Sequence, residues 1–369
     1  MKLVIHVDGP VIRGNERQLL LITRWMLSQG HDVAVACRDT TEVGQAFRDL
    51  GARTTPHRPR GDGDLWHQLR FAAWLRREKP DALLLASWKR FPAAASAARI
   101  AGVKRVILRV GLPQPIPESG PGAWKYRTAF RWIHGVIANA TGLRDYFAAL
   151  VPALADRMYT VRNATETERV APGGLRAEIG AAPGERVILS VGALEKRKGY
   201  DLLVDAFARL GPGVHLALAG DGPLRDELRA RADAAGIGSR VHLLGQRRDV
   251  GALMTAADAF VLPSRADGMA NVILEAMAAS LPVVAFDVHG AHDCLAPLEG
   301  RPPAGWIVPG GTADALAATL AELVAAMKSG DPEPATRGAE GRWRIEHWFT
   351  LEQMGPEYER VLFGAKNGG

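Results

Sequence analysis

Two carboxylates, Asp267 and Glu275, are the residues whose types and spacing most clearly indicate chemistry. They stand eight positions apart in the segment DGMANVILEAMAASLPVVAF at 267–286, and Glu275 is the one charge that follows Gly268 there. A carboxylate among apolar residues is costly to bury unless a partner hydrogen-bonds to it. The pattern predicts a loop, a helix, a tight turn and a strand, with Asp267 just before a helix N-terminus that can bind a phosphate. A core helix in which the buried Glu275 makes one polar contact is the alternative.

Three consecutive cations, Lys196, Arg197 and Lys198, follow a predicted strand and precede a predicted helix. Cations beside a helix N-terminus, at the C-terminal end of a strand, suit the charge of a diphosphate. A solvated basic loop is the alternative interpretation. The favoured interpretation is a loop that binds an anion.

Other motifs predict neither a metal centre nor a nucleophilic enzyme. His289, His292, Asp293 and Cys294 form the segment HGAHDC, whose spacing matches no standard zinc pattern, so we interpret it as a loop that lines a ligand cleft. The turn at 220–223 is not a dinucleotide fingerprint, because an arginine takes the place of the third glycine. No segment resembles the nucleophile elbow of a serine hydrolase.

The first half of the chain is basic. Residues 1–165 carry 25 Lys and Arg against 13 Asp and Glu, whereas the remainder carries 21 against 27. Within that half, the segment AWKYRTAFRWIH at 123–134 interleaves cations with aromatic rings, which indicates contact with an anionic surface. An arginine-rich solvated surface, or a core helix with snorkelling cations, is the alternative. Gly14 and Asn15 open a helix nearby, and the glycine lets the backbone approach a ligand closely.

Length and composition predict a soluble protein of two domains. The chain has 369 residues, of which 47% are apolar and 23% charged. Two cysteines give no disulfide framework, and the apolar run before Asp8 is too short for a signal peptide. No stretch has the uniform apolar character of a membrane span. We therefore expect a cytoplasmic protein.

Predicted strands and helices alternate along both halves, as in parallel βαβ units and doubly wound sheets. A polar, glycine-rich stretch at 163–174 is the predicted hinge between two such domains. The predicted strands are 3–7, 31–36, 53–55, 82–86, 105–109, 136–139 and 158–162, and then 187–191, 214–219, 241–244, 259–262, 283–286 and 305–308. The tail has two apolar pieces, 343–349 and 351–363, without strands. Ligands bind beyond the C-terminal ends of parallel strands, so the loops after them should carry a site in a cleft between the domains.

Several segments together resemble the retaining glycosyltransferases of family 4, which have the GT-B fold. The resemblance covers most of the chain. Its segments are Gly14-Asn15-Glu16, VRNA at 161–164, VGALEKRKG at 191–199, AGDGP at 219–223 and LPSRADGMANVILEAMAASLPVVA at 262–285. The last segment is the strongest match, because the family carries two acids separated by seven residues, as Asp267 and Glu275 are.

The resemblance implies a division of labour between two Rossmann-like domains. Residues 166–349 would bind a nucleotide-diphosphate sugar, and residues 1–165 would bind the acceptor, with a helix at 350–369 packing back on the first domain. Lys198, helped by Arg197, would neutralise the diphosphate leaving group. The other implied site residues are Asp267 and the backbone of Gly268, Met269, Ala270 and Asn271 for the sugar and phosphates, Glu275 for the ribose, Gly14 and Asn15 for the donor, and Arg109 and His289 for the acceptor or sugar side.

The implied reaction is transfer with retention to a hydroxyl, by front-face attack and without a metal or cofactor. The basic first domain adds the expectation of a lipid-linked or lipopolysaccharide-type glycan as acceptor, with peripheral contact to the anionic inner face of a membrane. We expect no nucleic-acid partner.

Three departures from the family pattern keep alternatives open. Asp267 is one methylene shorter than the usual glutamate, and Ala193 stands where many members have an arginine. Arg109-Val110 takes the place where a histidine often follows the strand. The alternatives are a GT-B nucleotide-sugar epimerase and a non-catalytic protein that binds nucleotide sugars, the latter motivated by Ala193 and Val110.

Overall fold

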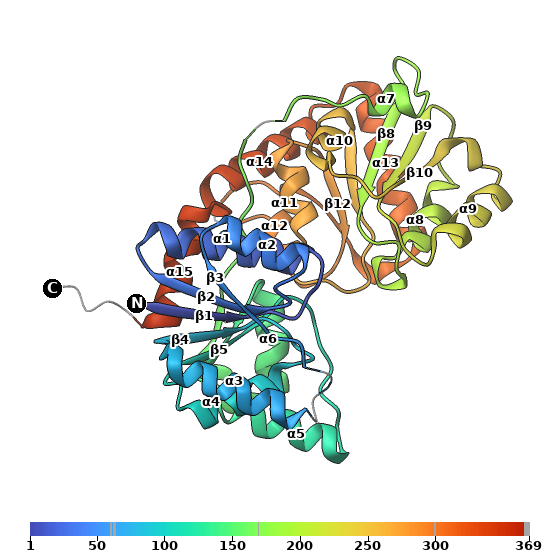
Figure 1. Ribbon diagram of the computed structural model, residues 1–369. Helices are drawn as coiled ribbons and strands as arrows, with labels where there is room; N and C mark the ends of the chain where they lie inside the picture. The colour runs from blue at the N-terminus through green and yellow to red at the C-terminus, as the bar shows by residue number, and fades with distance from the viewer. Residues whose placement is uncertain (60, 62–63, 169, 299, 365–369) are drawn as a thin grey trace. The chain divides into compact units, whose positions relative to one another are not determined.

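Two parallel β-sheets, each flanked by helices, organise the chain (Figure 1). The computed structural model describes residues 1–364 except 60, 62, 63, 169 and 299. The chain divides into a first unit, Met1–Ala164 with Leu351–Gly369, and a second unit, Thr165–Thr350. The end of the predicted segment 350–369 therefore lies outside the described residues. The predicted α/β class with two doubly wound sheets is confirmed.

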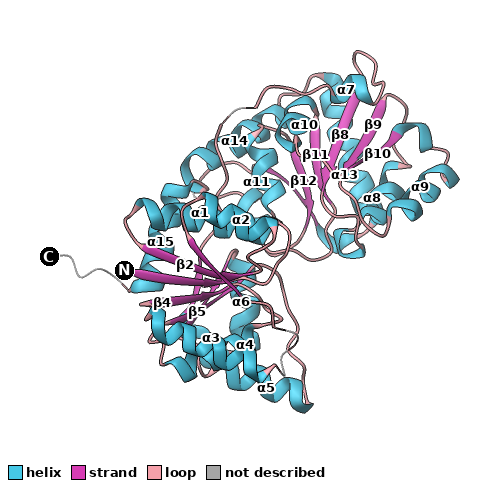
Figure 2. Cartoon of the chain, viewed as in Figure 1, coloured by secondary structure: helices cyan, strands magenta, loops and turns pink. Residues whose placement is uncertain are grey.

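The first unit has seven parallel strands in the order β3-β2-β1-β4-β5-β6-β7. The chain begins at the central β1 and builds outward in both directions, as doubly wound sheets do. The strands are β1 (Lys2–His6), β2 (Asp32–Cys37), β3 (Arg53–Pro56), β4 (Ala82–Leu85), β5 (Val106–Val110), β6 (Gly135–Ala138) and β7 (Met158–Thr160). The helices are α1 (Gly14–Ser28), α2 (Glu42–Asp49), α3 (Leu65–Glu78), α4 (Phe91–Ala101), α5 (Gly120–Phe130), α6 (Thr141–Leu150), η1 (Pro152–Arg157) and α15 (Leu351–Phe363). Figure 2 shows α1 and α2 on one face of this sheet and α3 and α4 on the other.

The C-terminal helix α15 belongs to the core of the first unit. Its Met354, Tyr358 and Leu362 are buried in the same apolar cluster as Leu19 and Ile22 of α1. Burying these side chains contributes roughly 2 kcal/mol each relative to leaving them in water. Helix α15 is therefore part of the first unit despite its distance along the chain.

The second unit has six parallel strands in the order β10-β9-β8-β11-β12-β13. The strands are β8 (Arg186–Val191), β9 (Val214–Ala219), β10 (Val241–Gly245), β11 (Ala259–Leu262), β12 (Val283–Phe286) and β13 (Gly305–Val308). The helices are α7 (Leu175–Glu178), η2 (Lys196–Lys198), α8 (Tyr200–Phe207), α9 (Arg225–Ala234), η3 (Gly238–Arg240), α10 (Val250–Ala256), α11 (Asn271–Ala278), α12 (Ala291–Leu295), η4 (Pro309–Gly311), α13 (Ala313–Ser329) and α14 (Glu333–Trp348).

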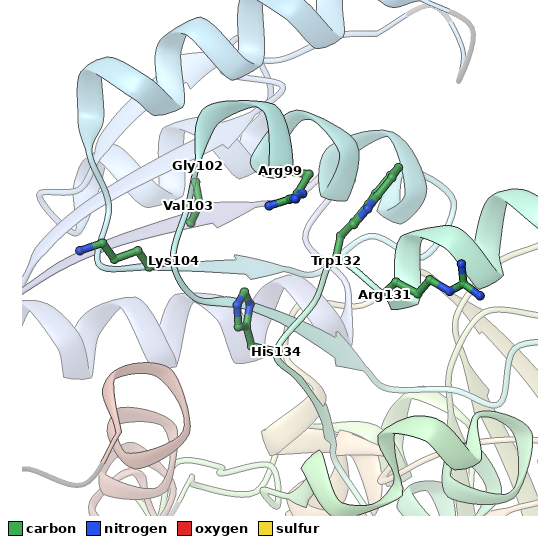
Figure 3. A pocket seen from close by; sticks show the side chains of 7 residues that line it. All are labelled: Arg99, Gly102, Val103, Lys104, Arg131, Trp132 and His134. Carbon is green, nitrogen blue, oxygen red and sulfur yellow. The ribbon is translucent and has the colours of Figure 1, made fainter.

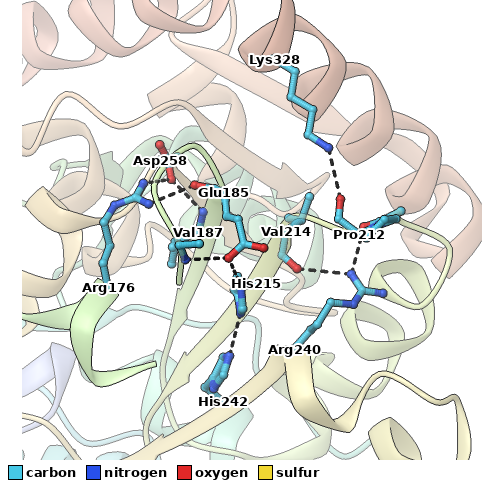
Figure 4. A network of polar contacts seen from close by, with 12 residues as sticks. Arg176, Glu185, Val187, Pro212, Val214, His215, Arg240, His242, Asp258 and Lys328 are labelled. Atoms are coloured by element: carbon cyan, nitrogen blue, oxygen red, sulfur yellow. Dashed lines mark hydrogen bonds and ion pairs between the residues drawn. The ribbon is translucent and has the colours of Figure 1, made fainter. Parts of the chain in front are cut away.

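A polar network ties together the first residues of strands β8, β9 and β10 (Figure 4). Asp258 accepts hydrogen bonds from Val187 N at 2.7 Å and from Arg186 Nη1 at 3.2 Å. His215 lies 2.9 Å from Glu185 and 3.0 Å from His242. These groups lie at the N-terminal ends of the strands, opposite the edge where ligands bind in such sheets, so we assign them to the fold.

Helix α14 is twice as long as the sequence pattern indicated. The apolar piece at 343–349 marks its end, but Gly338 and Gly341 in its middle weaken the local helical signal. A Cβ on Gly338 would lie 2.2 Å from Ser280 O, so the glycine permits the helix to approach the loop after α11. Tertiary packing therefore overrides a weak local propensity here. Short helices α2, α7 and α12 were likewise not predicted.

Within the described residues, no helix is both long enough and apolar enough to cross a membrane.

Candidate active site

Apart from Gly14 and Asn15, the predicted donor-side residues lie in the second unit, on elements that follow the C-terminal ends of neighbouring strands. Strand β8 leads to Lys196–Lys198, which form the short 3-10 helix η2; we name this segment the cation turn. Strand β11, which pairs with β8, leads to residues 263–270, which we name the acid loop, and then to α11. Parallel strands that are neighbours in the sheet therefore bring together two loops about 70 residues apart in the sequence.

Asp267 is the common partner of the two predicted cations. Lys198 Nζ lies 2.6 Å from Asp267 Oδ2, and Arg197 Nη1 lies 3.4 Å from the same oxygen. Arg197 Nη1 also donates to the carbonyl of Ala266 at 2.9 Å. Asp267 is only 6% exposed, so the carboxylate is compensated by the cations that surround it. The three residues predicted as catalytic are thus in one cluster.

The cation turn ends at a glycine whose position requires one. Gly199 has φ +70°, in the left-handed region, and a Cβ there would lie 1.9 Å from the carbonyl oxygen of Pro263 in the acid loop. Only glycine combines that conformation with that approach. The close contact fixes the distance between the cation turn and the acid loop.

The start of α11 is built for a ligand that accepts hydrogen bonds. Gly268, Met269 and Ala270 are buried and lead into the helix, which begins at the half-buried Asn271. Ala270 is the N-cap residue, and its methyl side chain cannot accept hydrogen bonds from the first turn. Of the backbone N–H groups of that turn, Ile273 N donates to the carbonyl of Ala270 at 3.0 Å, and a phosphate is an acceptor that suits groups at a helix start.

Glu275 differs from its sequence-based description. The pattern placed it as a buried carboxylate, but in the structure it is half-buried. The neighbouring Ile273, Leu274 and Met277 turn into the core, while Glu275 lies on the opposite side of α11. At 3.6 residues per turn, one polar position in an apolar run can face outward.

His289 lies in the loop after β12, beside the acid loop. Its neighbour Gly290 packs against the backbone of Gly268 and Met269. Burial lowers the pKa of the half-buried His289 below its usual value, although Asp287 opposes the shift. Among the described residues, no group of three His, Cys, Asp or Glu side chains is arranged to hold a metal ion.

The predicted residues of the first unit form a separate group around Arg109. Arg109 is 4% exposed, and its guanidinium donates to Tyr358 Oη at 2.9 Å, Asn15 Oδ1 at 2.6 Å and Asn163 Oδ1 at 3.0 Å. Asn15 in turn donates to the carbonyl of Ala86 at 3.2 Å. Arg109 thus links β5, the start of α1, the end of the first unit's main segment and α15. Gly14 lies next to Asn15 and is exposed.

Sequence reasoning missed several partners in these two groups. Tyr358 carries no local signal, because it lies 249 residues from Arg109 in the sequence. Asn163 and Arg265 stand inside segments that resemble the family, but the segments alone assigned no role to either residue. Long-range contacts such as these become visible only in the folded chain.

A pocket of about 600 Å³ on the first unit is lined by residues outside the predicted site (Figure 3). Its lining residues are Arg99, Gly102, Val103, Lys104, Arg131, Trp132 and His134. They lie just before β5 and β6, at the N-terminal edge of the sheet. A smaller pocket of about 230 Å³ runs along α5 and shares Arg131. We name the two pockets together the basic face.

Comparison with known proteins places both units in described families. The profile of "Glycosyltransferase Family 4" matches residues 12–169, and that of "Glycosyl transferases group 1" matches residues 175–331. The chain is 31% identical over 234 residues to the lipopolysaccharide core biosynthesis glycosyltransferase LpsE of Rhizobium meliloti, covering 63% of this chain and 65% of LpsE. It is 32% identical to the alpha-maltose-1-phosphate synthase of Mycolicibacterium smegmatis, with 62% of each chain covered. The matched regions thus span slightly less than two thirds of these relatives.

A solved structure has the same fold. The crystal structure of Anabaena Alr3699/HepE in complex with UDP and glucose matches with a TM-score of 0.82, covering 98% of this chain and 99% of HepE at 20% identity. Such a likeness establishes the shared fold, which confirms the GT-B architecture expected from the sequence.

Proposed function

Because this chain belongs to the family 4 glycosyltransferases, we propose that it transfers a sugar from a nucleotide-diphosphate sugar to a hydroxyl acceptor. The observation that carries the proposal is the pairing of Lys198 and Arg197 with Asp267 at the C-terminal edge of the second unit's sheet. Cations already held beside one anion are placed to receive another.

In this proposal the second unit binds the donor. Lys198 and Arg197 contact the diphosphate, and the backbone from Gly268 to Asn271 contacts the phosphates and the sugar. Glu275, half-buried on α11, accepts hydrogen bonds from the ribose hydroxyls. HepE was solved with UDP and glucose, which makes uridine diphosphate the first nucleotide to test here.

The proposed reaction proceeds with retention of configuration. The bond between the anomeric carbon and the diphosphate oxygen breaks, and the acceptor oxygen bonds to that carbon on the same face. The acceptor proton passes to the departing phosphate oxygen. Negative charge grows on the diphosphate during this step, and Lys198 and Arg197 stabilise it from fixed positions. Once the diphosphate occupies the cations, Asp267 is free to contact the sugar hydroxyls.

The same arrangement supports catalysis without a metal or other cofactor. Two fixed cations supply the countercharge that a magnesium ion gives in other sugar-nucleotide enzymes. Transfer should therefore persist in excess EDTA. Loss of activity with EDTA, restored by a divalent metal, would contradict this part of the proposal.

The first unit would bind the acceptor, which we propose to be a lipopolysaccharide-type or lipid-linked glycan. LpsE, a relative by sequence, is named for lipopolysaccharide core biosynthesis. Arg109, with His289 from the second unit, would act on the acceptor or sugar side, and Gly14 and Asn15 on the donor side. We place the protein in the cytoplasm, in keeping with its free, buried Cys37 and Cys294.

The basic face supports contact with the anionic inner surface of a membrane. Arg99, Lys104 and Arg131 line its larger pocket, and none of their side chains has a polar partner among the described residues (Figure 3). Trp124, which is largely exposed, lines the smaller pocket. An exposed tryptophan beside unpaired cations is typical of surfaces that sit in lipid headgroups, where each cation contributes about 1 kcal/mol.

Vesicle sedimentation tests the membrane contact. We expect the protein to sediment with phosphatidylglycerol vesicles and not with phosphatidylcholine vesicles. Replacing Arg131 and Lys104 by Glu should abolish binding, whereas Arg77→Glu on α3 should leave it intact. Equal sedimentation of both variants would contradict the assignment of this face.

Acceptor-dependent release of nucleoside diphosphate tests the function itself. The protein is incubated with a panel of nucleotide sugars, and nucleoside diphosphate is measured with and without lipopolysaccharide core acceptors. Transfer with retention predicts release that depends on the acceptor, with a product that keeps the anomeric configuration of the donor sugar. Interconversion of the nucleotide sugar without an acceptor would instead indicate an epimerase.

A further inference from the structure

Arg265 fastens the cation turn to the acid loop through the backbone. It stands in the acid loop, two residues before Asp267. Its own N–H donates to the carbonyl of Arg197 at 2.8 Å, and its Nη1 donates to the carbonyl of Lys196 at 2.7 Å. Arg265 therefore holds the carbonyl side of the turn, whereas Asp267 accepts from its side chains.

Asp201, in the first turn of α8, orients the guanidinium of Arg265. Nη1 and Nη2 each lie 2.7 Å from one carboxylate oxygen of Asp201, in a bidentate pair. The hydrogen bonds from Arg265 lower the pKa of Asp201, and those to Asp201 raise the pKa of Arg265. Both groups are therefore charged near neutral pH, and the planar fork of arginine fits this geometry better than lysine would.

The turn is poorly suited to hold its own shape. It places three like charges in a single 3-10 turn, and its closing hydrogen bond, from Gly199 N to Lys196 O, is long at 3.2 Å. Like charges in neighbouring positions repel, and a lone turn is too short to be cooperative. The hydrogen bonds from Arg265 to the carbonyls of Lys196 and Arg197 stabilise the conformation that the turn by itself would not hold.

Arg265 and Asp201 together form what we name the clamp. Its hydrogen bonds matter more for the position of the cation turn than for the stability of the fold. The side chains of Arg265 and Asp201 are 33% and 18% exposed, and partly exposed ion pairs add little to stability. A displacement of about 1 Å at a catalytic group, however, can cost roughly a hundredfold in rate. A residue that fixes the cations can thus affect the reaction strongly and the fold only slightly.

We propose that Arg265 is a positioning residue for the transfer reaction. Anchored by Asp201, it holds the carbonyls of Lys196 and Arg197 and so keeps the cations where the diphosphate binds. This inference rests on the proposed function for its chemical meaning, but the clamp itself can be tested without any ligand.

Hydrogen exchange of the free protein tests the clamp. In Arg265→Ala, the backbone N–H groups of Lys198 and Gly199 should exchange about tenfold faster than in the native protein. The matched control is Arg231→Ala, which removes another arginine–aspartate pair of the second unit, in which Nη1 contacts both carboxylate oxygens of Asp205. Unchanged exchange at residues 195–199 in Arg265→Ala would overturn the proposal, even if nucleotide binding had failed altogether.

Binding of two nucleotides separates positioning from a general loss of structure. By calorimetry, Arg265→Ala should bind uridine diphosphate about tenfold more weakly than the native protein and uridine monophosphate less than twofold more weakly. Arg265→Lys should recover part of the difference, since it keeps one cationic donor. An equal loss for both nucleotides would reduce Arg265 to a structural role. Failure of the native protein to bind any nucleoside diphosphate would count against the proposed function instead.

Discussion

Lys198 in the second unit and Arg109 in the first unit are both largely buried cations, but their partners differ in kind. The Lys198 side chain is 14% exposed and is paired with the carboxylate of Asp267. Arg109 is 4% exposed, and its guanidinium donates hydrogen bonds to two amide oxygens, of Asn15 and Asn163, and to the hydroxyl of Tyr358. One cation is neutralised by a charge, whereas the other is solvated by neutral groups.

Because of this difference, Lys198 can exchange one anion for another, whereas Arg109 holds parts of the fold together. A carboxylate can be replaced by a diphosphate, because both are anions that suit the same donors. Neutral oxygens accept hydrogen bonds from Arg109 without cancelling its positive charge. The same hydrogen bonds hold three segments of the chain in place. We infer that Lys198 acts by contact with the diphosphate, and that Arg109, which we propose for the acceptor or sugar side, also holds Asn15 and α15 in place.

The largest expected effect comes from removing the exchangeable cation. Lys198→Ala should lower turnover by about 10³-fold, or roughly 4 kcal/mol, because a fixed charge beside the leaving diphosphate is lost. Lys328→Ala, which removes an exposed lysine bonded to Pro212 O, is the matched control and should retain native rates. Both are measured as acceptor-dependent release of nucleoside diphosphate. Native turnover in Lys198→Ala would show that Lys198 does not stabilise the leaving diphosphate, and would contradict its distinction from Arg109.

Removing the other cation should affect stability first. Arg109→Met leaves the oxygens of the buried Tyr358 and Asn163 and of the half-buried Asn15 without their donor, which we expect to lower the free energy of unfolding by about 3 kcal/mol. Arg77→Met, at an exposed position on α3, should change it by less than about 0.5 kcal/mol. Urea unfolding measures both. If Arg109→Met proved as stable as the control but inactive, Arg109 would belong with Lys198 as a ligand contact.

Acid should weaken the first unit more than the second between pH 6.5 and 4. Burial, and then Arg90, lowers the pKa of His6 in the first unit to about 4. Between pH 6.5 and 4 the unfolded chain binds a proton that the folded unit does not, so the free energy of unfolding falls by about 3 kcal/mol as pH falls.

The contrasting group in the second unit is Asp201, whose folded pKa is lowered by Arg265. Its contribution is present above the pKa of an unfolded Asp and is lost only as pH falls further, below about 4. Hydrogen exchange measured from pH 7 to pH 4 should show the first unit opening before the second. His6→Phe should remove the part of that early loss that His6 contributes, whereas the part from His57, whose pKa is also lowered by burial, should remain. If the second unit opened first, the prediction that acid weakens the first unit more would be wrong.

The smallest expected effect tests whether Asp267 competes with the donor for the cations. Asp267→Asn removes the negative charge, so uridine diphosphate should bind about fivefold more tightly, or roughly 1 kcal/mol, while turnover falls. Asp249→Asn, which relaxes an exposed pair with Arg247, is the control and should leave affinity unchanged. Weaker binding in Asp267→Asn would mean that the carboxylate orders the cations and does not compete with the ligand.

Local patterns in the chain were sufficient for the architecture and for the principal charged residues. The periodicity of a buried strand or an amphipathic helix is a property of contiguous residues. The two doubly wound sheets could therefore be predicted from the alternation of these patterns. The cation turn and Asp267 could also be identified as candidate site residues, because both are charged positions beside a predicted helix start. Where propensity was weak, as at the glycines of α14, the local pattern failed.

Tertiary structure alone decided which of these residues touch. Lys198 meets Asp267 across 69 positions because β8 and β11 are neighbours in the sheet, and Arg109 meets Tyr358 because α15 returns to the first unit. The role of Arg265 and the half-exposed position of Glu275 likewise depend on what packs beside them. Sequence periodicity describes each element by itself, whereas a contact is a property of two elements that only the fold brings together.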